Sequence, residues 1–174
     1  MADFDGRVAL ITGASGNLGA AVARAFAARG ARLALVERRP EKLERAFPEW
    51  AASPDHLFGR ADLTDAEAVA AIAQAAVERF GRIDILVNTA GGYRAGAPAH
   101  QTPAEDWDFL LDLNLRTAVN ASRAVVPHML RRGEGKIVHT AARAALAGRA
   151  NMAAYVISKS TIIRLTESMA AELK

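Results

Sequence analysis

The chain has 174 residues, 51% of them hydrophobic, and no cysteine. This length fits one domain with a sizeable core, and the missing thiols exclude disulfides, thiolate metal sites and a cysteine nucleophile. The net charge of +3 comes from basic and acidic residues that are scattered among one another, which indicates a solvated surface. No apolar stretch is long enough to span a membrane, and the N-terminus lacks a signal-peptide pattern. We therefore expect a cytoplasmic protein that binds neither nucleic acid nor membrane.

Short apolar runs of strand length alternate with longer stretches of helical period along the whole chain. In chain order we predict a strand over 7–12, a helix over 18–29, a strand over 32–37, a helix over 40–47, a strand over 56–61, a helix from 64 to 80, a strand over 83–88, a long helix from 102 to 132, a strand over 136–140 and a final helix that carries Tyr155. This alternation implies one α/β domain, residues 1–174, with a parallel sheet wound on both faces and ligands outside the carboxyl ends of its strands.

Two of these helices begin with the pattern of a capping box, in which a Ser or Thr and a Glu three residues later satisfy each other's backbone N–H groups. The first pattern is Thr64 followed by Glu67. The second begins at Thr102 and has Pro103 at the first helical position. Both helices are therefore predicted to be capped by threonine.

A glycine-rich turn joins the first strand to the first helix. It reads Thr12-Gly13-Ala14-Ser15-Gly16-Asn17-Leu18-Gly19. Because the turn follows a strand directly and opens a helix, its backbone N–H groups and the helix N-terminus can face a pyrophosphate. We predict a dinucleotide site whose contacts from this turn are Gly13, Ser15, Asn17, Leu18 and Gly19.

Tyr155 and Lys159 lie four residues apart and share one face of the last predicted helix. A phenol titrates near pH ~10, so it exchanges protons at neutral pH only where a nearby cation stabilises the phenolate. The pair therefore suits acid/base chemistry next to a dinucleotide.

Together these residues resemble the short-chain dehydrogenase/reductase family of classical type. The resemblance covers nearly the whole chain and rests on the glycine turn, Asp62 after the third strand, Asn88-Thr89-Ala90-Gly91 after the fourth, Asn114 in the long helix, and Tyr155 with Lys159. It implies a Rossmann-like fold of three layers, a nicotinamide cofactor, and an oxidoreductase that transfers a hydride between this cofactor and a small alcohol or ketone.

The resemblance also implies a role for each matching residue. Tyr155 is expected to be the acid/base, Lys159 to bind the nicotinamide ribose and activate the tyrosine, and Asn114 to support a water relay. Further cofactor contacts are expected along the strand ends, from Asp62 and Leu63 near the adenine and from Asn88, Ala90 and Gly91 beside the central sheet.

One catalytic position departs from the family's pattern. Typical members have a serine thirteen residues before the tyrosine that hydrogen-bonds the substrate oxygen, and here that position holds Ala142. Losing one such donor costs about 10²–10³ in turnover. Thr140 shares a strand face with Ala142 and is the predicted substitute. An alternative is therefore a nicotinamide-binding protein with impaired catalysis, which serves as a scaffold or as the silent subunit of a hetero-oligomer.

The cofactor turn departs from the pattern as well, because Asn17 stands where most classical members have the middle glycine. Asparagine tolerates left-handed backbone better than most residues, so the turn can survive. Gly16 creates a glycine at every third position, which looks like the pattern of sugar-nucleotide epimerases, a third and more distant possibility. The motif from Asn88 to Gly91 favours the classical branch.

The choice of cofactor depends on the end of the second strand. Glu37 lies there, about twenty residues beyond the glycine turn, where a carboxylate accepts hydrogen bonds from a ribose 2′-OH and repels a 2′-phosphate. This favours NAD. Arg38 and Arg39 follow and could hold a phosphate, so NADP is the second choice.

The sequence ends at Lys174, whereas classical members continue through two further strands and a loop over the substrate. We expect the natural chain to continue, because one sheet edge would otherwise be unpaired and apolar. Members of the family commonly assemble through their two long helices. The apolar residues of the last helix predict a homodimer or homotetramer of this kind; they are Ile157, Ile162, Ile163, Leu165 and Met169.

Overall fold

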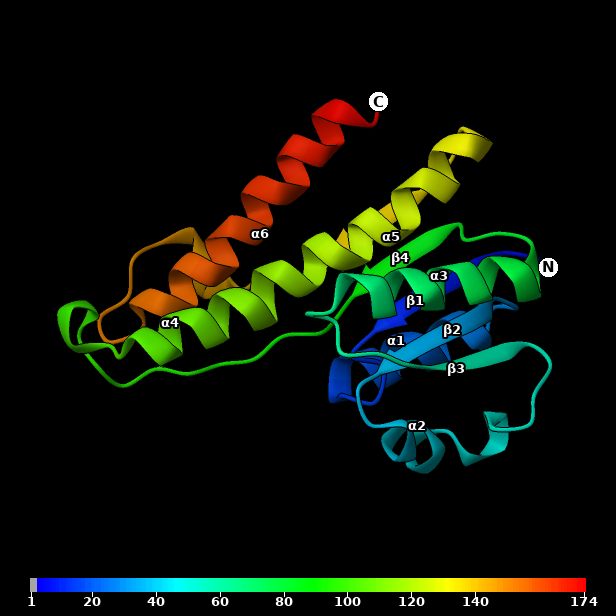
Figure 1. Ribbon diagram of the computed structural model, residues 1–174, viewed down its shortest axis with the longest axis horizontal. Helices are drawn as coiled ribbons and strands as arrows, with labels where there is room; N and C mark the ends of the chain where they lie inside the picture. The colour runs from blue at the N-terminus through cyan, green and yellow to red at the C-terminus, as the bar shows by residue number, and fades with distance from the viewer. Residues whose placement is uncertain (1–2) are drawn as a thin grey trace.

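The computed structural model describes residues 3–174 as a five-stranded parallel sheet with helices on both faces (Figure 1). The strands are β1 (Val8–Thr12), β2 (Arg32–Glu37), β3 (His56–Arg60), β4 (Ile85–Asn88) and β5 (Lys136–His139). The helices are α1 (Asn17–Ala27), α2 (Pro40–Ala46), α3 (Ala66–Phe80), α4 (Ala104–Leu111), α5 (Thr117–Arg132) and α6 (Ala153–Glu172). The spatial order β3-β2-β1-β4-β5 confirms the predicted Rossmann-like α/β fold.

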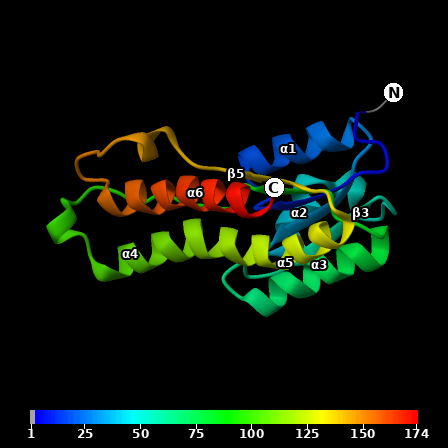
Figure 2. The ribbon, with the colours of Figure 1, turned by 90° about the horizontal axis from the view of Figure 1, so that it is seen from above.

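The central strands β1 and β4 are apolar up to their last residues, Thr12 and Asn88, because both of their faces are covered. Every residue of β1 and β4 is buried. Side chains of α3 and α5 pack on one face of the sheet, and side chains of α1 and α2 pack on the other. Figure 2 shows α1 on the opposite side of the sheet from α3 and α5. No helix within residues 3–174 is both long and apolar enough to cross a membrane.

Strand register brings the predicted site segments together at the carboxyl ends of the strands. Thr12 pairs with Val36 of β2 on one side and with Asn88 of β4 on the other. Thr140, which follows β5, donates its backbone N–H to the carbonyl of Asn88 at 3.1 Å. The glycine turn, the end of β2 and the loops after β4 and β5 therefore begin side by side.

The two capping-box predictions are wrong. Asp65 caps α3, and its carboxylate accepts hydrogen bonds from two N–H groups of the first turn. Thr64 lies one residue before this cap and outside the helix, and its hydroxyl donates to Asp62 at 2.7 Å. At the second site α4 begins at Ala104, and the hydroxyl of Thr102 donates to a carbonyl that precedes the helix. Local hydrogen bonds to neighbouring polar groups therefore decide both helix starts.

The long predicted helix is interrupted between α4 and α5. Asp112–Arg116 forms a five-residue π-helical turn, and Asn114 lies at its centre. A π-turn adds a residue to the helical repeat and rotates the following side chains about the axis. The predicted long helix is therefore present, but it contains a π-turn at the position of a predicted site residue, and Asn114 is 2% exposed.

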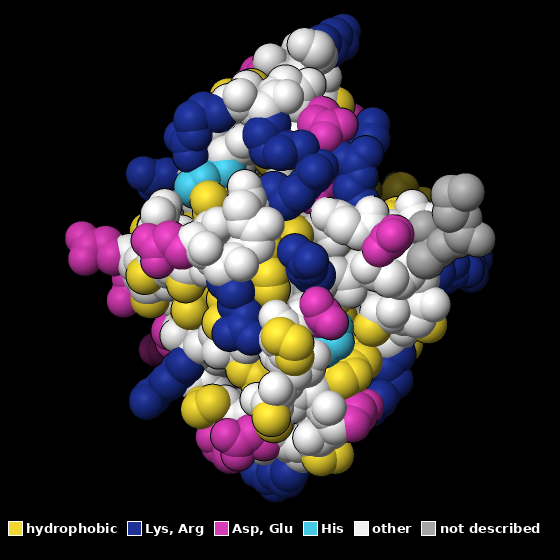
Figure 3. Space-filling model, turned by 90° about the vertical axis from the view of Figure 1, so that its right-hand side faces the viewer, with side chains coloured by type: hydrophobic (Ala, Val, Ile, Leu, Met, Phe, Trp, Pro, Cys, Tyr) yellow, Lys and Arg dark blue, Asp and Glu magenta, His cyan; other side chains and the backbone are white. Residues whose placement is uncertain are grey.

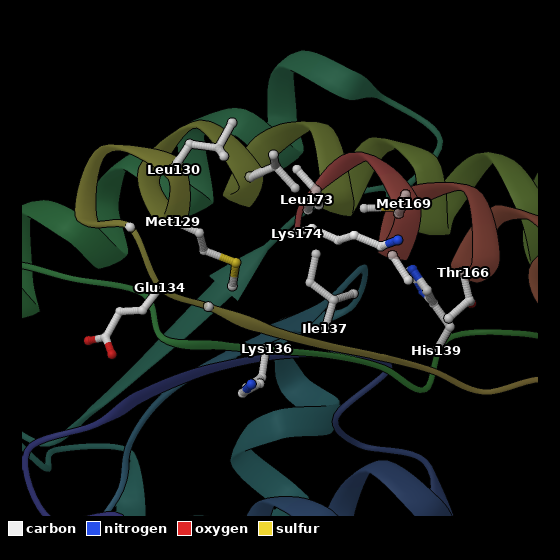
Figure 4. Close-up of a pocket in the computed structure, with 14 residues that line it drawn as sticks. Met129, Leu130, Glu134, Lys136, Ile137, His139, Thr166, Met169, Leu173 and Lys174 are labelled. Carbon is white, nitrogen blue, oxygen red and sulfur yellow. The ribbon is translucent and has the colours of Figure 1, made fainter.

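The outer edge of β5 is unpaired within residues 3–174, as expected, and the side chain of Val138 on it is 52% exposed. A cavity of about 450 Å³ lies between β5 and the C-terminal halves of α5 and α6 (Figure 4). Ile137 points toward the two helices, whereas Lys136 points away from them. None of the predicted cofactor-binding residues lines this cavity.

The opposite end of the sheet is held by a charge cluster around Asp84, which is 4% exposed. Its carboxylate accepts hydrogen bonds from Arg7, Arg82 and the backbone N–H of Val8. Burial opposes ionisation of Asp84, but these hydrogen bonds outweigh it and hold the pKa of the carboxyl below its usual range. Figure 3 shows this face of the molecule, where basic and acidic side chains alternate. The cluster ties strand ends together far from the predicted site.

Candidate active site

A cavity of about 960 Å³ opens at the carboxyl ends of β1, β2, β3 and β4. It is the place where a doubly wound sheet binds ligands. The predicted residues that line it are Gly13, Ser15, Glu37, Asp62, Leu63, Ala90 and Gly91. The predicted residues outside its lining are Asn17, Leu18, Gly19, Asn88, Asn114, Thr140, Tyr155 and Lys159.

The glycines of the turn permit a close approach of three backbone segments. Gly13 has φ +62°, and a Cβ built on it would lie 2.8 Å from the backbone of Ala90. A Cβ on Gly19 would overlap the carbonyl of Gly13. Asn17 is the first residue of α1, so it needs no left-handed backbone; within residues 3–174 the non-glycine residue with positive φ is Asn151. The turn therefore keeps its form without the usual middle glycine.

Two threonines join the turn to the loop after β4. The hydroxyl of Thr89 donates to the carbonyl of Thr12 at 2.6 Å, and the hydroxyl of Thr12 donates to the side-chain oxygen of Asn88 at 3.0 Å. The amide nitrogen of Asn88 lies 2.9 Å from Nδ1 of His139. The oxygen and the nitrogen of the Asn88 amide thus both bind side chains of the neighbouring strands. Thr89 belongs to the motif from Asn88 to Gly91, but no individual role was predicted for it.

Two carboxylates line the cavity where it borders the loops after β2 and β3. Glu37 accepts a hydrogen bond from the hydroxyl of Ser15 at 2.5 Å and one from the backbone N–H of Arg38 at 3.1 Å. Asp62 accepts two from Thr64, one from its hydroxyl and one from its N–H. These bonds, with a smaller contribution from Arg38, hold the pKa of Asp62 below its usual range. Both groups are therefore positioned as acceptors.

Lys159 extends from α6 toward Gly91, which lines the cavity. The side chain is 6% exposed, and its Nζ donates to the carbonyl of Thr140 at 2.9 Å. A Cβ on Gly91 would lie 2.9 Å from this Nζ and 2.8 Å from Oδ1 of Asn114, so the glycine leaves room for both groups. Burial lowers the pKa of Lys159. No carboxylate forms an ion pair with it within residues 3–174, so its charge is available to the site.

Asn114 connects the loop after β4 with the tyrosine helix. Its Oδ1 accepts from the N–H of Gly92 at 2.9 Å, and its Nδ2 donates to the carbonyl of Gly92 at 3.1 Å and to the hydroxyl of Ser158 at 3.0 Å. Ser158 in turn donates to the carbonyl of Tyr155 at 2.9 Å. No role was predicted for Ser158 from the sequence, although it stands directly before Lys159. Asn114 therefore fixes the relative position of Gly92 and the first turn of α6.

Tyr155 lies in the first turn of α6 and is partly buried. Its ring meets the ring of Tyr93 edge to face, with the centroids 4.8 Å apart and the planes at 81°. Tyr93 is 61% exposed, and sequence reasoning also missed it. Ala142 has extended backbone just before a short 3₁₀ turn. The backbone of Thr140 is engaged by Lys159, and a donor role for its hydroxyl stays a prediction.

Comparison with known proteins agrees with this arrangement. Residues 7–174 match the short chain dehydrogenase family. The chain is 41% identical over 170 residues to 2-(R)-hydroxypropyl-CoM dehydrogenase of Xanthobacter autotrophicus, covering 95% of this chain and 68% of that protein. It is also 41% identical over 170 residues to D-threitol dehydrogenase of Mycolicibacterium smegmatis, covering 97% of this chain and 65% of that protein.

A solved structure of NAD⁺-bound xylitol dehydrogenase is similar at a TM-score of 0.93 and 38% identity, covering 98% of this chain and 66% of that one. The chain thus spans about two thirds of the length of these relatives. Because the family match covers nearly every residue and the fold and strand-end motifs agree with it, the chain belongs to the short-chain dehydrogenase family.

Proposed function

We propose that this protein is an NAD(H)-dependent oxidoreductase that transfers a hydride between the cofactor and a small alcohol or ketone. The observation that carries this proposal is the arrangement around Gly91, which lines the cavity of about 960 Å³. Nζ of Lys159 and Oδ1 of Asn114 both lie against this glycine, and Asn114 is linked through Ser158 to the backbone carbonyl of Tyr155. Lysine is rarely buried unless it is paired with a carboxylate, so a structural role alone does not explain why Lys159 is buried without one in the described part of the chain.

The residues present fit a dinucleotide in several ways. The N-terminus of α1 can face the pyrophosphate, and a Cβ at Gly13 would press on the backbone of Ala90. Ser15 and Glu37 would hold the adenine ribose, and Lys159 the nicotinamide ribose with N–H donors that Thr140 leaves free. The bound nicotinamide would give or accept the hydride. The similar xylitol dehydrogenase contains NAD⁺, which supports NAD as the cofactor.

In the proposed reaction the chain itself handles the proton. Tyr155 would donate its hydroxyl proton to a ketone oxygen, or remove the proton of an alcohol in the reverse direction. The ammonium of Lys159, one helical turn away, would attract the negative charge that develops on the oxygen during this transfer. Asn114 would hold the loop at Gly92 against α6, so that the distance between the proton donor and the cofactor cavity stays fixed.

The cofactor assignment predicts a clear binding preference. Titration of the protein with NADH and NADPH, followed by fluorescence, should show tighter binding of NADH. The variant Glu37→Ala should lower the ratio of the Kd for NADPH to the Kd for NADH by about tenfold or more. It removes an acceptor for the ribose hydroxyl of NADH and a charge that repels the 2′-phosphate of NADPH. Glu44→Ala is the matched control, since Glu44 is exposed on the nearby helix α2 and does not line the cavity. Tighter binding of NADPH by the starting protein would contradict the assignment.

A second candidate function follows from Ala142, which cannot donate a hydrogen bond to a substrate oxygen. In this case the protein would bind the nicotinamide cofactor and act as a scaffold or as the silent subunit of a hetero-oligomer. Steady-state turnover with a panel of secondary alcohols separates the two candidates. Cofactor binding with turnover supports the enzyme, and cofactor binding without turnover supports the silent protein.

We also propose that the protein forms a homodimer or homotetramer through α4, α5 and α6, which extend beyond the sheet (Figure 1). Ile162 is buried, but Ile157 on α6 is 45% exposed and Leu130 on α5 is 62% exposed. Large apolar side chains exposed on neighbouring helices are typical of a subunit interface. Light scattering at micromolar concentration should report two or four subunits. A monomer under these conditions would count against the interface.

A further inference from the structure

The hydroxyl of Ser15 connects the glycine turn with the end of β2. It donates to Oε2 of Glu37 at 2.5 Å, while Oε1 of the same carboxylate accepts from the backbone N–H of Arg38 at 3.1 Å. Ser15 and Glu37 are partly buried, and both line the cavity of about 960 Å³. Both oxygens of the carboxylate are therefore held by protein donors.

The two donors restrain Glu37 very differently. The N–H of Arg38 belongs to the next residue, so it follows the glutamate backbone and limits the side chain only locally. Ser15 is 22 residues away in the chain and lies in another loop, so its bond fixes the far end of a side chain that otherwise rotates freely. Short hydrogen bonds to a carboxylate are among the stronger ones in proteins.

The same bond also affects how a 2′-phosphate would be received. A serine hydroxyl has a single hydrogen, and here it is directed to Glu37. It is therefore withheld from any phosphate at the same place. The guanidinium of Arg38, which could hold such a phosphate, lies 4.0 Å from the carboxylate of Asp62 and is 70% exposed. The bond between Ser15 and Glu37 thus keeps a negative charge in the cavity. It also leaves the cavity with one hydrogen-bond donor fewer for a phosphate.

We propose that Ser15 is a specificity-determining positioning residue, which holds the Glu37 carboxylate where it selects NAD(H) over NADP(H). This inference rests on the proposed function, because it assumes that the cavity binds a nicotinamide dinucleotide. Ser15 acts through Glu37. Its contribution to the preference for NAD(H) must therefore disappear when Glu37 is absent.

A double-mutant cycle on cofactor preference tests this directly. The ratio of the Kd for NADPH to the Kd for NADH is measured by fluorescence titration for the starting protein, Ser15→Ala, Glu37→Ala and the double variant. Ser15→Ala should lower the ratio by about three- to thirtyfold, as expected for one hydrogen bond to a charged group. In the Glu37→Ala background the same change should no longer lower the ratio, because the hydroxyl then has no carboxylate to position and can only help to hold a 2′-phosphate. Ser15→Thr, which keeps a hydroxyl, should retain most of the preference.

Ser53→Ala is the matched control, because Ser53 lies before β3, at the other end of the sheet from the cavity. It should keep the full ratio. An unchanged ratio in Ser15→Ala, or an equal drop in both backgrounds, would overturn the role of Ser15 while the proposed function stands. A starting protein that binds neither dinucleotide would overturn the proposed function and, with it, this assignment.

Discussion

Replacing Tyr155 by phenylalanine should lower kcat/KM for an alcohol or ketone by about 10²–10⁴, the usual contribution of a positioned acid/base. Phenylalanine preserves the ring, and with it the edge-to-face contact with Tyr93 at 4.8 Å, but lacks the proton that is exchanged. The affinity for NADH should therefore change little. Steady-state kinetics and NADH titration on the same preparation measure both quantities.

The NADH titration is the internal control of this experiment, since it shows whether the first turn of α6 still holds Lys159 in place. A variant that binds NADH normally and keeps more than about a tenth of the turnover would show that the proton comes from another group. A variant that loses NADH binding would show that the phenol contributes to the cofactor site itself.

Introducing a serine at Ala142 should give the largest increase in kcat/KM. If the alanine is the missing donor to the substrate oxygen, Ala142→Ser should raise kcat/KM by about ten- to a thousandfold, because one preorganised donor contributes about this much. Ala142 is partly buried and has extended backbone, a conformation that serine adopts readily. Steady-state kinetics with a panel of secondary alcohols and ketones measures the gain.

The neighbouring alanine supplies the control for this variant. Ala141→Ser adds the same hydroxyl one residue away, where an extended chain points it to the other side, so it should leave the rates unchanged. If Thr140 already serves as the donor, Thr140→Val should lower the starting activity and Ala142→Ser should add little. No gain from Ala142→Ser, with activity surviving in Thr140→Val, would show that neither position supplies the donor.

The fold could be predicted from the sequence because its signals are local. Apolar runs such as that of β4 mark strands covered on both faces, and each strand is followed by a helical stretch. Parallel strands place their carboxyl ends together, so the glycine turn, Glu37 and the residues after β3 and β4 could be assigned to one edge before any contact was known. The cavity at this edge collects seven of the predicted residues.

The details that escaped prediction depend on contacts between distant segments. The π-turn at Asn114 accompanies its bonds to Gly92, which is 22 residues earlier in the chain. The contact between Tyr93 and Tyr155 joins the loop after β4 with the first turn of α6. At the start of α3 the neighbouring residue Asp65 supplies the cap in place of Thr64, a choice between two adjacent polar residues that the sequence pattern does not reveal.

The proposed function requires that this site transfer hydride between NAD(H) and an alcohol or ketone. The most direct measurement incubates the protein, in amounts equal to NAD⁺, with secondary alcohols deuterated at the carbinol carbon, and follows the label by mass spectrometry. Stoichiometric protein allows even a slow reaction to be detected. We predict deuterium on the nicotinamide ring of the NADH formed, and a rate of labelling about 10²–10⁴ lower with Tyr155→Phe. Unlabelled nicotinamide from both the starting protein and Ala142→Ser, with cofactor binding intact, would contradict the proposed function.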